Sequence, residues 1–547
     1  MRWLFILGGV VVLLAGALAL AWPHRIALPG MLDRWRDPIG ETQHVVWDQG
    51  PQTTDTAPGE RSPNVIVILV DDLGINDITT FGGGLAAGDV PTPNIDAIAA
   101  NGAVFVNGYA GNATCAPSRA AIMTGRYATR FGFEFTPAPV AFHRLVGSFD
   151  YGPREAIFHD DRVAEAIPTD QQGLPPEEIT MAEILRDSGY RTLFIGKWHL
   201  GAAEPFQPQN QGFDEWVGFY PGAALFLPPG HPDAVNLRQD FDPIDPFLWA
   251  NLNYAVRWNG SQRFAPDGYM TDYFADQAVN AIQANRNRPF FLYLALNAPH
   301  TPLQALRSDV EALGHIEDER LRIYAAMIRA VDRAVGRVRE TLVEEGLAEN
   351  TIIVFSSDNG APGYIGFPDL NAPYRGWKAT FFEGGIRVPM LVEWPARVTP
   401  GTVIEAPAAH VDLFTTAARA AGADLPGDRT IDGIDLIDVA TGGAAPERAL
   451  FWRSGHYRVL MHEGWKLQVS EHPQRTWLFN LAEDPTEQTD LADAEPARLA
   501  AMMARLEALD AEQAEPIWPS LVEPPVFIDR HLLEPLSEED DYVHWPN

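Results

Sequence analysis

Polar and ionisable side chains follow four apolar runs of the chain, where buried strands are expected to end. The runs cover residues 64–70, 192–195, 290–296 and 351–355. The residues that follow them are, in chain order, Asp71 and Asp72, Lys197 and His199, His300, and Asp358 and Asn359. Each of these alone is typical of a turn or a helix cap. Four such strand ends together indicate a site.

The residues after the first and last runs offer only oxygen ligands. Two adjacent carboxylates repel each other and need a cation or strong hydrogen bonds beside them. Oxygen donors suit calcium or magnesium, whereas zinc prefers His or Cys. Lys197, His199 and His300 add positive or proton-carrying groups, so the sequence predicts a centre where a metal and cations hold an anion.

The elements that position these residues are predicted from hydrophobic patterning. The four runs, and a further run at 389–392, are typical of strands buried on both faces of a sheet. Helical patterns lie between them at 179–187, 269–284 and 321–345. This alternation predicts an α/β fold with a large mixed, mostly parallel sheet flanked by helices. Ligands bind beyond the carboxyl ends of strands in such sheets, which is where the polar residues stand.

The chain of 547 residues contains one cysteine, Cys115. One cysteine excludes an intramolecular disulfide and a cysteine-based zinc cluster. It stands in Cys115-Ala-Pro-Ser-Arg119, which is followed by Thr-Gly-Arg at 124–126. This stretch resembles the motif by which type I sulfatases have their cysteine oxidised to formylglycine. We therefore interpret Cys115 as a functional residue and not as a core filler.

Further motifs resemble the sulfatase branch of the alkaline phosphatase superfamily and occur in that family's order. They are DDLG at 71–74, GKWHLG at 196–201, APHTP at 298–302, SDNG at 357–360 and GWKAT at 376–380. The resemblance implies an alkaline phosphatase-like fold. It also implies a smaller C-terminal α+β subdomain that contains a short antiparallel sheet.

The resemblance also implies a role for each matching residue. One divalent cation, most often calcium in this family and with magnesium as the alternative, would be bound by five residues. They are Asp71, Asp72, Asp358, Asn359 and Cys115 in its formylglycine form. Arg119 would hold the aldehyde hydrate. The groups around the sulfate would be Lys197, His199, His300 and Lys378.

The hydrate of an aldehyde carries two hydroxyls on one carbon. One hydroxyl can attack sulfur, and loss of the proton from the other then expels sulfate and restores the aldehyde. We expect His300 to act as the acid toward the leaving oxygen and His199 as the base for elimination, although these roles could be exchanged. The predicted activity is arylsulfatase-like hydrolysis of a small sulfate ester to inorganic sulfate and an alcohol or phenol.

Three alternatives stay open at this point. The same residues could serve a phosphonate monoester or phosphodiester hydrolase of the superfamily. The substrate could be a carbohydrate sulfate, with steroid sulfates also open. The protein could also bind anions without catalysis. Aromatic-rich loops at 129–161 and 231–260 are expected to line the substrate pocket.

The net charge and the N-terminal segment indicate which partners and which cellular location to expect. The net charge of −33 argues against nucleic acid as a partner. The apolar stretch from Leu4 to Trp22 ends in a small-x-small pattern, so residues 1–22 are read as a signal peptide or an N-terminal membrane anchor. Either reading predicts an exported protein, periplasmic, extracellular or anchored facing outward. During export it would meet the formylglycine-generating machinery.

The remaining boundaries follow changes in composition. Residues 23–62 are predicted to form a linker, 63–444 the catalytic domain, 445–514 the C-terminal subdomain and 515–547 a tail rich in proline, aromatic and acidic residues. The tail could cover the site or join subunits, so an oligomer remains open.

Overall fold

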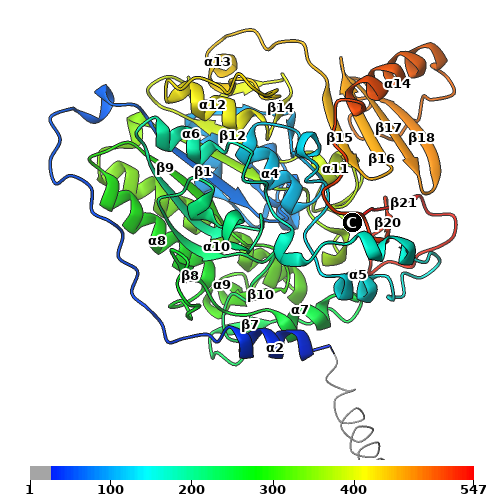
Figure 1. Cartoon of the computed structure of the whole chain (residues 1–547), viewed down its shortest axis with the longest axis horizontal. Coiled ribbons are helices and arrows are strands. Elements are labelled where there is room, and N and C mark those ends of the chain that lie inside the picture. Colours follow the sequence, from blue (N-terminus) through cyan, green and yellow to red (C-terminus); the bar gives the residue numbers. More distant parts are fainter. Residues whose placement is uncertain (1–25) are drawn as a thin grey trace, which may run out of the picture.

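The computed structural model describes residues 26–547, and a nine-stranded sheet lies at its centre (Figure 1). The order across the sheet is β13 (Thr402–Ile404), β2 (Ala103–Phe105), β12 (Met390–Glu393), β11 (Thr351–Ser357), β1 (Asn64–Val70), β9 (Phe290–Ala295), β5 (Arg191–Lys197), β6 (Glu215–Phe219) and β8 (Arg257–Trp258). The five strands from β11 to β6 are parallel to one another, and β12 and β8 flank them as antiparallel strands. The predicted large, mixed and mostly parallel sheet is therefore confirmed.

Helices cover both faces of this sheet, and the alternation of side chains along β1 shows how. Ile66, Ile68 and Val70 belong to one core cluster, which also contains residues of α3, α8 and α10. The intervening residues of β1 belong to a second cluster, with residues of α4, α6, α12 and α13. A strand that buries both faces has no polar side to show, which explains the continuous apolar run NVIVILV.

The helix bounds are α2 Leu28–Arg36, α3 Pro93–Asn101, α4 Cys115–Thr124, α5 Val140–Val146, α6 Met181–Asp187, α7 Asp245–Asn251, α8 Met270–Asn285, α9 Arg307–Ala312, α10 Glu319–Glu344, α11 Glu383–Ile386, α12 Asp412–Ala420, α13 Leu436–Ala440 and α14 Pro496–Asp510. The helices predicted at 179–187, 269–284 and 321–345 correspond to α6, α8 and α10 within a few residues. The loops at 129–161 and 231–260 contain α5 and α7 and are not wholly irregular.

The run at 389–392 forms strand β12, which is antiparallel to β11 and to β2. The segment between β11 and β12 contains one short helix, α11, and so does not cross over the sheet like a βαβ connection. Consequently β12 enters from the edge where β11 ends and runs in the opposite direction. The intervening segment lies beside the site and contains Lys378.

A second sheet follows the nine-stranded sheet in the chain. It has four antiparallel strands, β15 (Leu450–Ser454), β16 (Tyr457–His462), β17 (Trp465–Glu471) and β18 (Gln474–Asn480), and α14 packs against it (Figure 1). A third core cluster joins residues of this sheet to Phe381, Phe382 and Ile386 beside α11. The predicted C-terminal antiparallel sheet is confirmed, and it is docked through an apolar interface.

The segment 515–547 packs on both parts of the molecule. Strand β19 (Val522–Glu523) pairs with β4 (Ile157–Phe158), and β20 (Pro525–Phe527) pairs with β21 (Tyr542–His544). The other short pairs are β3 (Gly108–Tyr109) with β14 (Ala408–Ala409) and β7 (Ala234–Asn236) with β10 (Gln304–Leu306). The amide of Leu532 donates to the carbonyl of Gly363 at 3.2 Å, in the β11–β12 connection.

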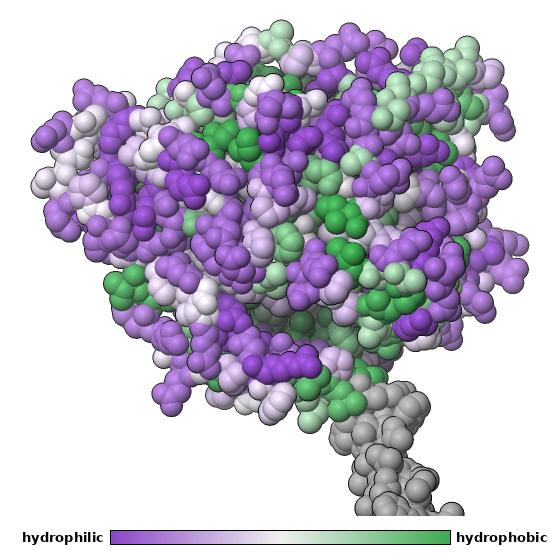
Figure 2. Space-filling model, in the orientation of Figure 1, coloured by the Kyte–Doolittle hydropathy of each residue, from purple (hydrophilic) through white to green (hydrophobic). Residues whose placement is uncertain are grey.

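The segment before β1 runs over the catalytic domain. It includes α2, and its Val45 and Trp47 are buried in the core. The predicted signal peptide or anchor at 1–22 lies outside the described residues. Within residues 26–547, no helix combines the length and the apolar character needed to cross a bilayer. Figure 2 shows a face covered mainly by hydrophilic residues, with scattered apolar patches.

Candidate active site

The carboxyl ends of four neighbouring parallel strands form one edge of the central sheet. The order β11-β1-β9-β5 brings together the residues that follow each strand, although they come from distant parts of the chain. The site is built from Asp71, Asp72, Cys115, Arg119, Lys197, Asp358, Asn359 and Lys378, which we call the active-edge cluster. His300 and His199 lie beside it.

Cys115 is the first residue of helix α4 and is buried. Its Sγ lies 3.3 Å from Lys378 Nζ, 3.5 Å from Asp71 Oδ1 and 3.8 Å from Asp72 Oδ1. The positive end of the dipole of α4 also points toward this position, which favours a bound anion. A reactive group on residue 115 would therefore face a lysine, two carboxylates and a helix N-terminus.

Two buried ion pairs flank the cysteine. Lys197 Nζ lies 2.8 and 2.7 Å from the two oxygens of Asp71. Arg119, one turn along α4 from Cys115, donates through Nε and Nη2 to Asp358 Oδ2 at 2.9 and 2.8 Å. Its Nη1 donates to the carbonyl of Lys197 at 2.8 Å, so it also fixes the end of β5.

Asp72 collects donors from three directions. Lys378 Nζ lies 2.7 and 2.8 Å from its two oxygens, and Asn359 Nδ2 donates to Oδ1 at 2.7 Å. The hydroxyl of Tyr364 donates to Oδ2 at 2.9 Å. The sequence patterns did not single out Tyr364, because it lies in the β11–β12 connection, outside the predicted strand ends.

The donor set fits a hard divalent cation. Ligand atoms of Asp71, Asp72, Cys115 and His300 lie within 4.8 Å of one another. The Oδ1 atom of Asn359 is buried and has no hydrogen-bond partner within residues 26–547. A buried amide oxygen without a donor requires an explanation, and a cation among carboxylates supplies one.

Burial and charge set the ionisation of the cluster. Burial raises the pKa of Asp71 to about 7, against the opposing effect of Lys197. Burial also acts on Asp72, but Lys378 and His300 outweigh it and lower its pKa below the usual range. Burial raises the pKa of the Cys115 thiol, so this side chain is a neutral thiol and not a thiolate nucleophile.

The two predicted histidines differ in their contacts. His300 Nδ1 donates to the carbonyl of Thr301 at 2.6 Å, so the lone pair lies on Nε2, which is 3.6 Å from Asp72 Oδ2. Burial lowers its pKa to about 3. His199 is also neutral, because burial and then Lys197 lower its pKa far below 6.5. Its Nδ1 is buried and finds no hydrogen-bond partner in the described part of the chain.

Three residues at the site have a strained backbone. Asp72, His199 and Ala379, which follows Lys378, have φ angles of 64°, 60° and 65°. Residues other than glycine adopt this left-handed region at a cost, and such strain is typical of functional positions. Gly196, before Lys197, has φ 117°, and a Cβ there would lie 1.9 Å from the carbonyl oxygen of Ala295.

Two further residues support the site without having been predicted. His410 is buried behind α4 and links two elements, because its Nδ1 is 2.9 Å from Ser118 Oγ and its Nε2 is 3.0 Å from Ser356 Oγ. Gly222 lies against His199, and a Cβ there would come within 2.7 Å of the imidazole. A lone histidine and a loop glycine carry no sequence signal that separates them from ordinary packing residues.

Comparisons with known proteins agree with this geometry. The family model described as Sulfatase matches residues 63–423. The chain is 33% identical over 413 residues to N-acetylgalactosamine-6-sulfatase of Canis lupus familiaris, covering 73% of this chain and 70% of that protein. It is 33% identical over 458 residues to steryl-sulfatase of Mus musculus, covering 71% and 66%. The crystal structure of Ps i-CgsB in complex with k-i-k-neocarrahexaose superposes with a TM-score of 0.68 and 30% identity, covering 84% and 95%.

Proposed function

Because the chain belongs to the sulfatase family and is a sulfuric ester hydrolase, we propose that it acts through a formylglycine made from Cys115 and through one divalent cation. The observation that carries the proposal is the position of Cys115. It is the first residue of α4, within 3.8 Å of both Asp71 and Asp72 and 3.3 Å from Lys378. Burial raises the pKa of its thiol, which disfavours a thiolate nucleophile and is compatible with a modified side chain at this position.

Formylglycine supplies an oxygen nucleophile when it is hydrated, and the cation supplies a Lewis acid and charge stabilisation. The residues proposed to hold the cation are Asp71, Asp72, Asp358 and Asn359, together with the oxygen of modified residue 115. The free Oδ1 of Asn359 supports this assignment. The oxygen donors suit Ca²⁺ and Mg²⁺ alike. We propose calcium because the family resemblance favours it, with magnesium as the alternative.

The charge balance of the cluster supports anion binding. Three carboxylates, those of Asp71, Asp72 and Asp358, face three cationic side chains, those of Arg119, Lys197 and Lys378. A divalent cation added to this balanced set leaves the site with excess positive charge. Because the surroundings are buried, this charge attracts a sulfate group more strongly than it would in water.

The basic side chains are proposed to divide the work. Lys378 lies beside both Cys115 and Asp72, so it can hold a sulfate oxygen next to the reacting atom. Arg119 is locked onto Asp358 and the end of β5, so it orients residue 115 within α4. Lys197 neutralises Asp71 and reaches the same anion.

The two histidines are proposed to move the protons. The free Nε2 of His300 faces the cluster and is the candidate to carry a proton to the leaving oxygen, after a bound anion has favoured its protonation. His199, neutral and without a partner at Nδ1, is the candidate base for the elimination step. Variants of His300 and His199 distinguish this assignment from the opposite one. The variant of the base for elimination should retain the first sulfate-transfer step, and the variant of the acid should not.

The relatives favour a sulfated carbohydrate as the natural substrate. N-acetylgalactosamine-6-sulfatase and Ps i-CgsB both have carbohydrate names or ligands. A small aryl sulfate, which was the first expectation, then serves as a reporter substrate, and a steryl sulfate is the third class to test.

The test compares kcat/KM on aryl, steryl and carbohydrate sulfates with matched phosphate diesters and phosphonate monoesters. We expect a sulfate ester to be the best substrate by at least about tenfold, which corresponds to about 1.4 kcal/mol of transition-state preference. A phosphate diester or phosphonate preferred by orders of magnitude would overturn the sulfatase proposal. Mass spectrometry of the peptide that contains residue 115 separately tests conversion of the thiol to an aldehyde.

We also propose that the protein acts outside the cytoplasm. The support is the apolar segment Leu4–Trp22, which lies outside the described residues. Cell fractionation and N-terminal sequencing of the mature protein test this directly, since a cleaved signal removes residues 1–22 and an anchor retains them.

A further inference from the structure

Three histidines surround one carboxylate at the junction of the C-terminal subdomain and the tail. The carboxylate is Glu523 of β19. His456 lies in the turn between β15 and β16, His472 in the turn between β17 and β18, and His159 directly follows β4. None of these residues belongs to the active-edge cluster. Four separate chain segments therefore meet at one buried carboxyl group.

The three histidines contact different oxygens of the Glu523 carboxylate. His472 Nδ1 lies 2.7 Å and His456 Nε2 lies 3.3 Å from Glu523 Oε2. His159 Nε2 lies 2.7 Å from the other oxygen, Oε1. The ligand atoms of His456, His472 and Glu523 all lie within 4.8 Å of one another.

The contact between His456 and Glu523 is the longest of the three histidine contacts. The His456 side chain is 8% exposed and that of Glu523 is 3% exposed. His456 Nε2 is buried and faces Oε2, yet it has no aligned hydrogen bond within residues 26–547. A buried imidazole held to the carboxylate only by this long, poorly aligned contact is available to an ion that both groups could bind.

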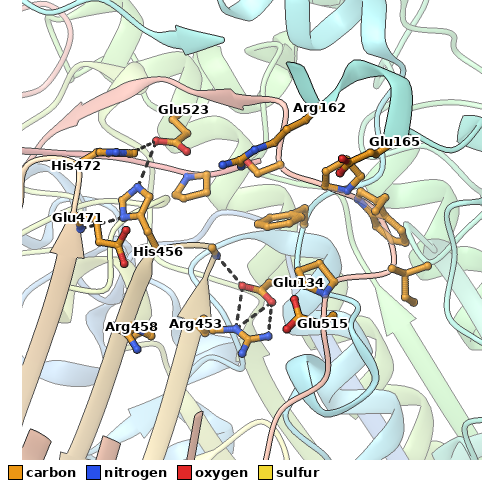
Figure 3. A pocket seen from close by; sticks show the side chains of 18 of the residues that line it. Glu134, Arg162, Glu165, Arg453, His456, Arg458, Glu471, His472, Glu515 and Glu523 are labelled. Carbon is orange, nitrogen blue, oxygen red and sulfur yellow. Dashed lines mark hydrogen bonds and ion pairs between the residues drawn. The ribbon is translucent and has the colours of Figure 1, made fainter. Parts of the chain in front are cut away.

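The cluster lies at one end of a polar cavity of about 660 Å³ (Figure 3). The Glu134–Arg453 ion pair lies further along the cavity, and Arg162, Glu165 and Arg458 also line it. Water and small ions can therefore reach Glu523, and a water molecule has room to complete a coordination sphere.

We propose that His456 Nε2, His472 Nδ1 and the Glu523 carboxylate form a binding site for a divalent transition metal of the zinc class. Two imidazoles and one carboxylate suit zinc, which is commonly held by His and Asp/Glu ligands, whereas calcium takes oxygen ligands. His159, bonded to the opposite carboxylate oxygen, orients Glu523 toward the metal. The site is thus chemically distinct from the all-oxygen centre proposed beside Cys115.

Metal loading would require a change of tautomer at both histidine ligands. His472 gives up the 2.7 Å hydrogen bond from Nδ1 to Glu523 Oε2, and its ring proton moves to Nε2. The amide of Glu471 donates to His456 Nδ1 at 3.2 Å, which leaves the ring proton on Nε2 in the metal-free protein. Binding at Nε2 moves this proton to Nδ1 and gives up that long contact. The gain is a link between the two turns of the C-terminal sheet and the tail strand β19, which should stabilise the folded protein.

The test uses the full-length protein, stripped of metal and then saturated with Ca²⁺ so that the active-edge cluster is filled. Zn²⁺ is added, unbound metal is removed by gel filtration, and retained zinc is counted by elemental mass spectrometry. We expect one retained zinc per chain and a higher melting temperature. Co²⁺ in place of Zn²⁺ should give the intense visible absorption of a low-symmetry nitrogen–oxygen site.

Two variants test the ligands independently of each other. Glu523→Gln and His472→Ala should each lose the retained zinc and the cobalt spectrum. His159→Ala should weaken zinc binding by about 10- to 100-fold, as expected for a residue that orients a ligand. His462→Ala is the matched control, from the Glu447–His462–Glu463 group whose carboxylates are exposed, and it should retain the zinc.

The results show whether zinc binds at Glu523, in the active-edge cluster or elsewhere. Zinc retained equally by Glu523→Gln and His472→Ala, with circular dichroism of the wild-type protein, overturns the proposal. Zinc lost only when Asp72→Asn is introduced places the metal in the active-edge cluster and also overturns it. Failure of zinc binding leaves the sulfatase proposal intact, because sulfate-ester turnover is measured separately in Ca²⁺.

Discussion

Two buried clusters of charge in this molecule differ in how their polar atoms are satisfied. The active-edge cluster holds three carboxylates and three cationic groups around Cys115. The second, which we call the junction cluster, consists of Lys466, Glu383 and Glu487, whose side chains are all 0% exposed. It lies where the C-terminal sheet meets α11 of the catalytic domain.

The junction cluster leaves none of its side-chain oxygens or nitrogens without a partner in the described structure. Lys466 Nζ lies 2.8 Å from Glu383 Oε1 and 3.0 Å from Glu487 Oε1. Tyr109 donates to Glu383 at 3.1 Å, and Gln468 donates to Glu487 at 2.9 Å. This arrangement is complete, so its role is to join two parts of the fold.

In the active-edge cluster, by contrast, some buried polar atoms have no hydrogen-bond partner in the described structure. Asn359 Oδ1 and the neighbouring His199 Nδ1 have no hydrogen-bond partner among residues 26–547. The two clusters are both buried but differ in their roles. The cluster in which every group is paired stabilises the fold, and the cluster in which groups stay free is prepared for a ligand.

The largest expected effect is the loss of turnover on replacing Cys115 with alanine. The active-edge cluster then keeps its charges but lacks the residue proposed to become the nucleophile. We expect kcat to fall on the order of 10⁶-fold, as for other nucleophile deletions, while the melting temperature changes little. Residual turnover within tenfold of wild type would show that residue 115 is not the nucleophile.

Removal of the divalent cation should affect only one of the two clusters. We expect chelation to lower kcat by about 10²- to 10³-fold, because the charge stabilisation supplied by the cation is lost, and Ca²⁺ to restore it. Asn359→Leu should raise the Ca²⁺ concentration needed for half-maximal rate. An enzyme that keeps full rate after exhaustive chelation would contradict the assignment of the oxygen donors.

Lys466→Met should break the junction cluster and leave two buried carboxylates without their shared cation. We expect the free energy of unfolding to fall by about 3–5 kcal/mol, measured by urea denaturation. The kcat of the protein that remains folded should be unchanged. The double variant Lys466→Met/Glu487→Gln should recover part of the loss, and equal stability of the single and double variants would argue against a buried charge as the cause.

Gly222→Ala tests whether the position of His199 matters. A Cβ at residue 222 would lie 2.7 Å from the imidazole, and the ring must shift to make room. We expect kcat to fall by up to about 10²-fold with KM nearly constant and unfolding little changed. Gly230→Ala is the control, because no atom lies within 4 Å of a Cβ there. Equal kcat in both variants would remove His199 from the proton-transfer scheme.

The smallest effect is a pH dependence that comes from the junction cluster. Burial, and then Glu383, raise the pKa of Glu487 to about 7 from its ordinary value of 4.5, against the opposing effect of Lys466. Between these values the folded protein holds more protons than the unfolded chain, so stability falls as pH rises from about 4.5 to about 7. Glu487→Gln should make this fall shallower when melts are recorded in saturating Ca²⁺. An unchanged slope would mean that Glu487 does not titrate in this range.

The sequence was sufficient to predict the sheet and most of its chemistry. The run NVIVILV is typical of a strand that is buried on both faces, and the polar residues after such a strand lie at the carboxyl edge. The motifs around Cys115, Lys197 and Asp358 are local, so they can be read without knowing the fold.

The direction of β12 and the residues that it brings could not be predicted in this way. An apolar run is the same in a parallel and an antiparallel strand, and only the return of the connection decides between them. That connection carries Tyr364 onto Asp72 and contacts Leu532 of the tail. Contacts of this kind depend on side chains that are distant in sequence and have ordinary residue types.

The chain by itself therefore determined the class of chemistry, because a nucleophile motif and strand-end ligands are encoded in short segments. Only the tertiary structure decided which groups are satisfied and which are free. It paired Lys466 fully, left Asn359 Oδ1 open, and gathered three histidines around Glu523. The physical reason is that ligand sites depend on distances of a few ångströms between segments, and these distances are set by packing and not by spacing along the chain.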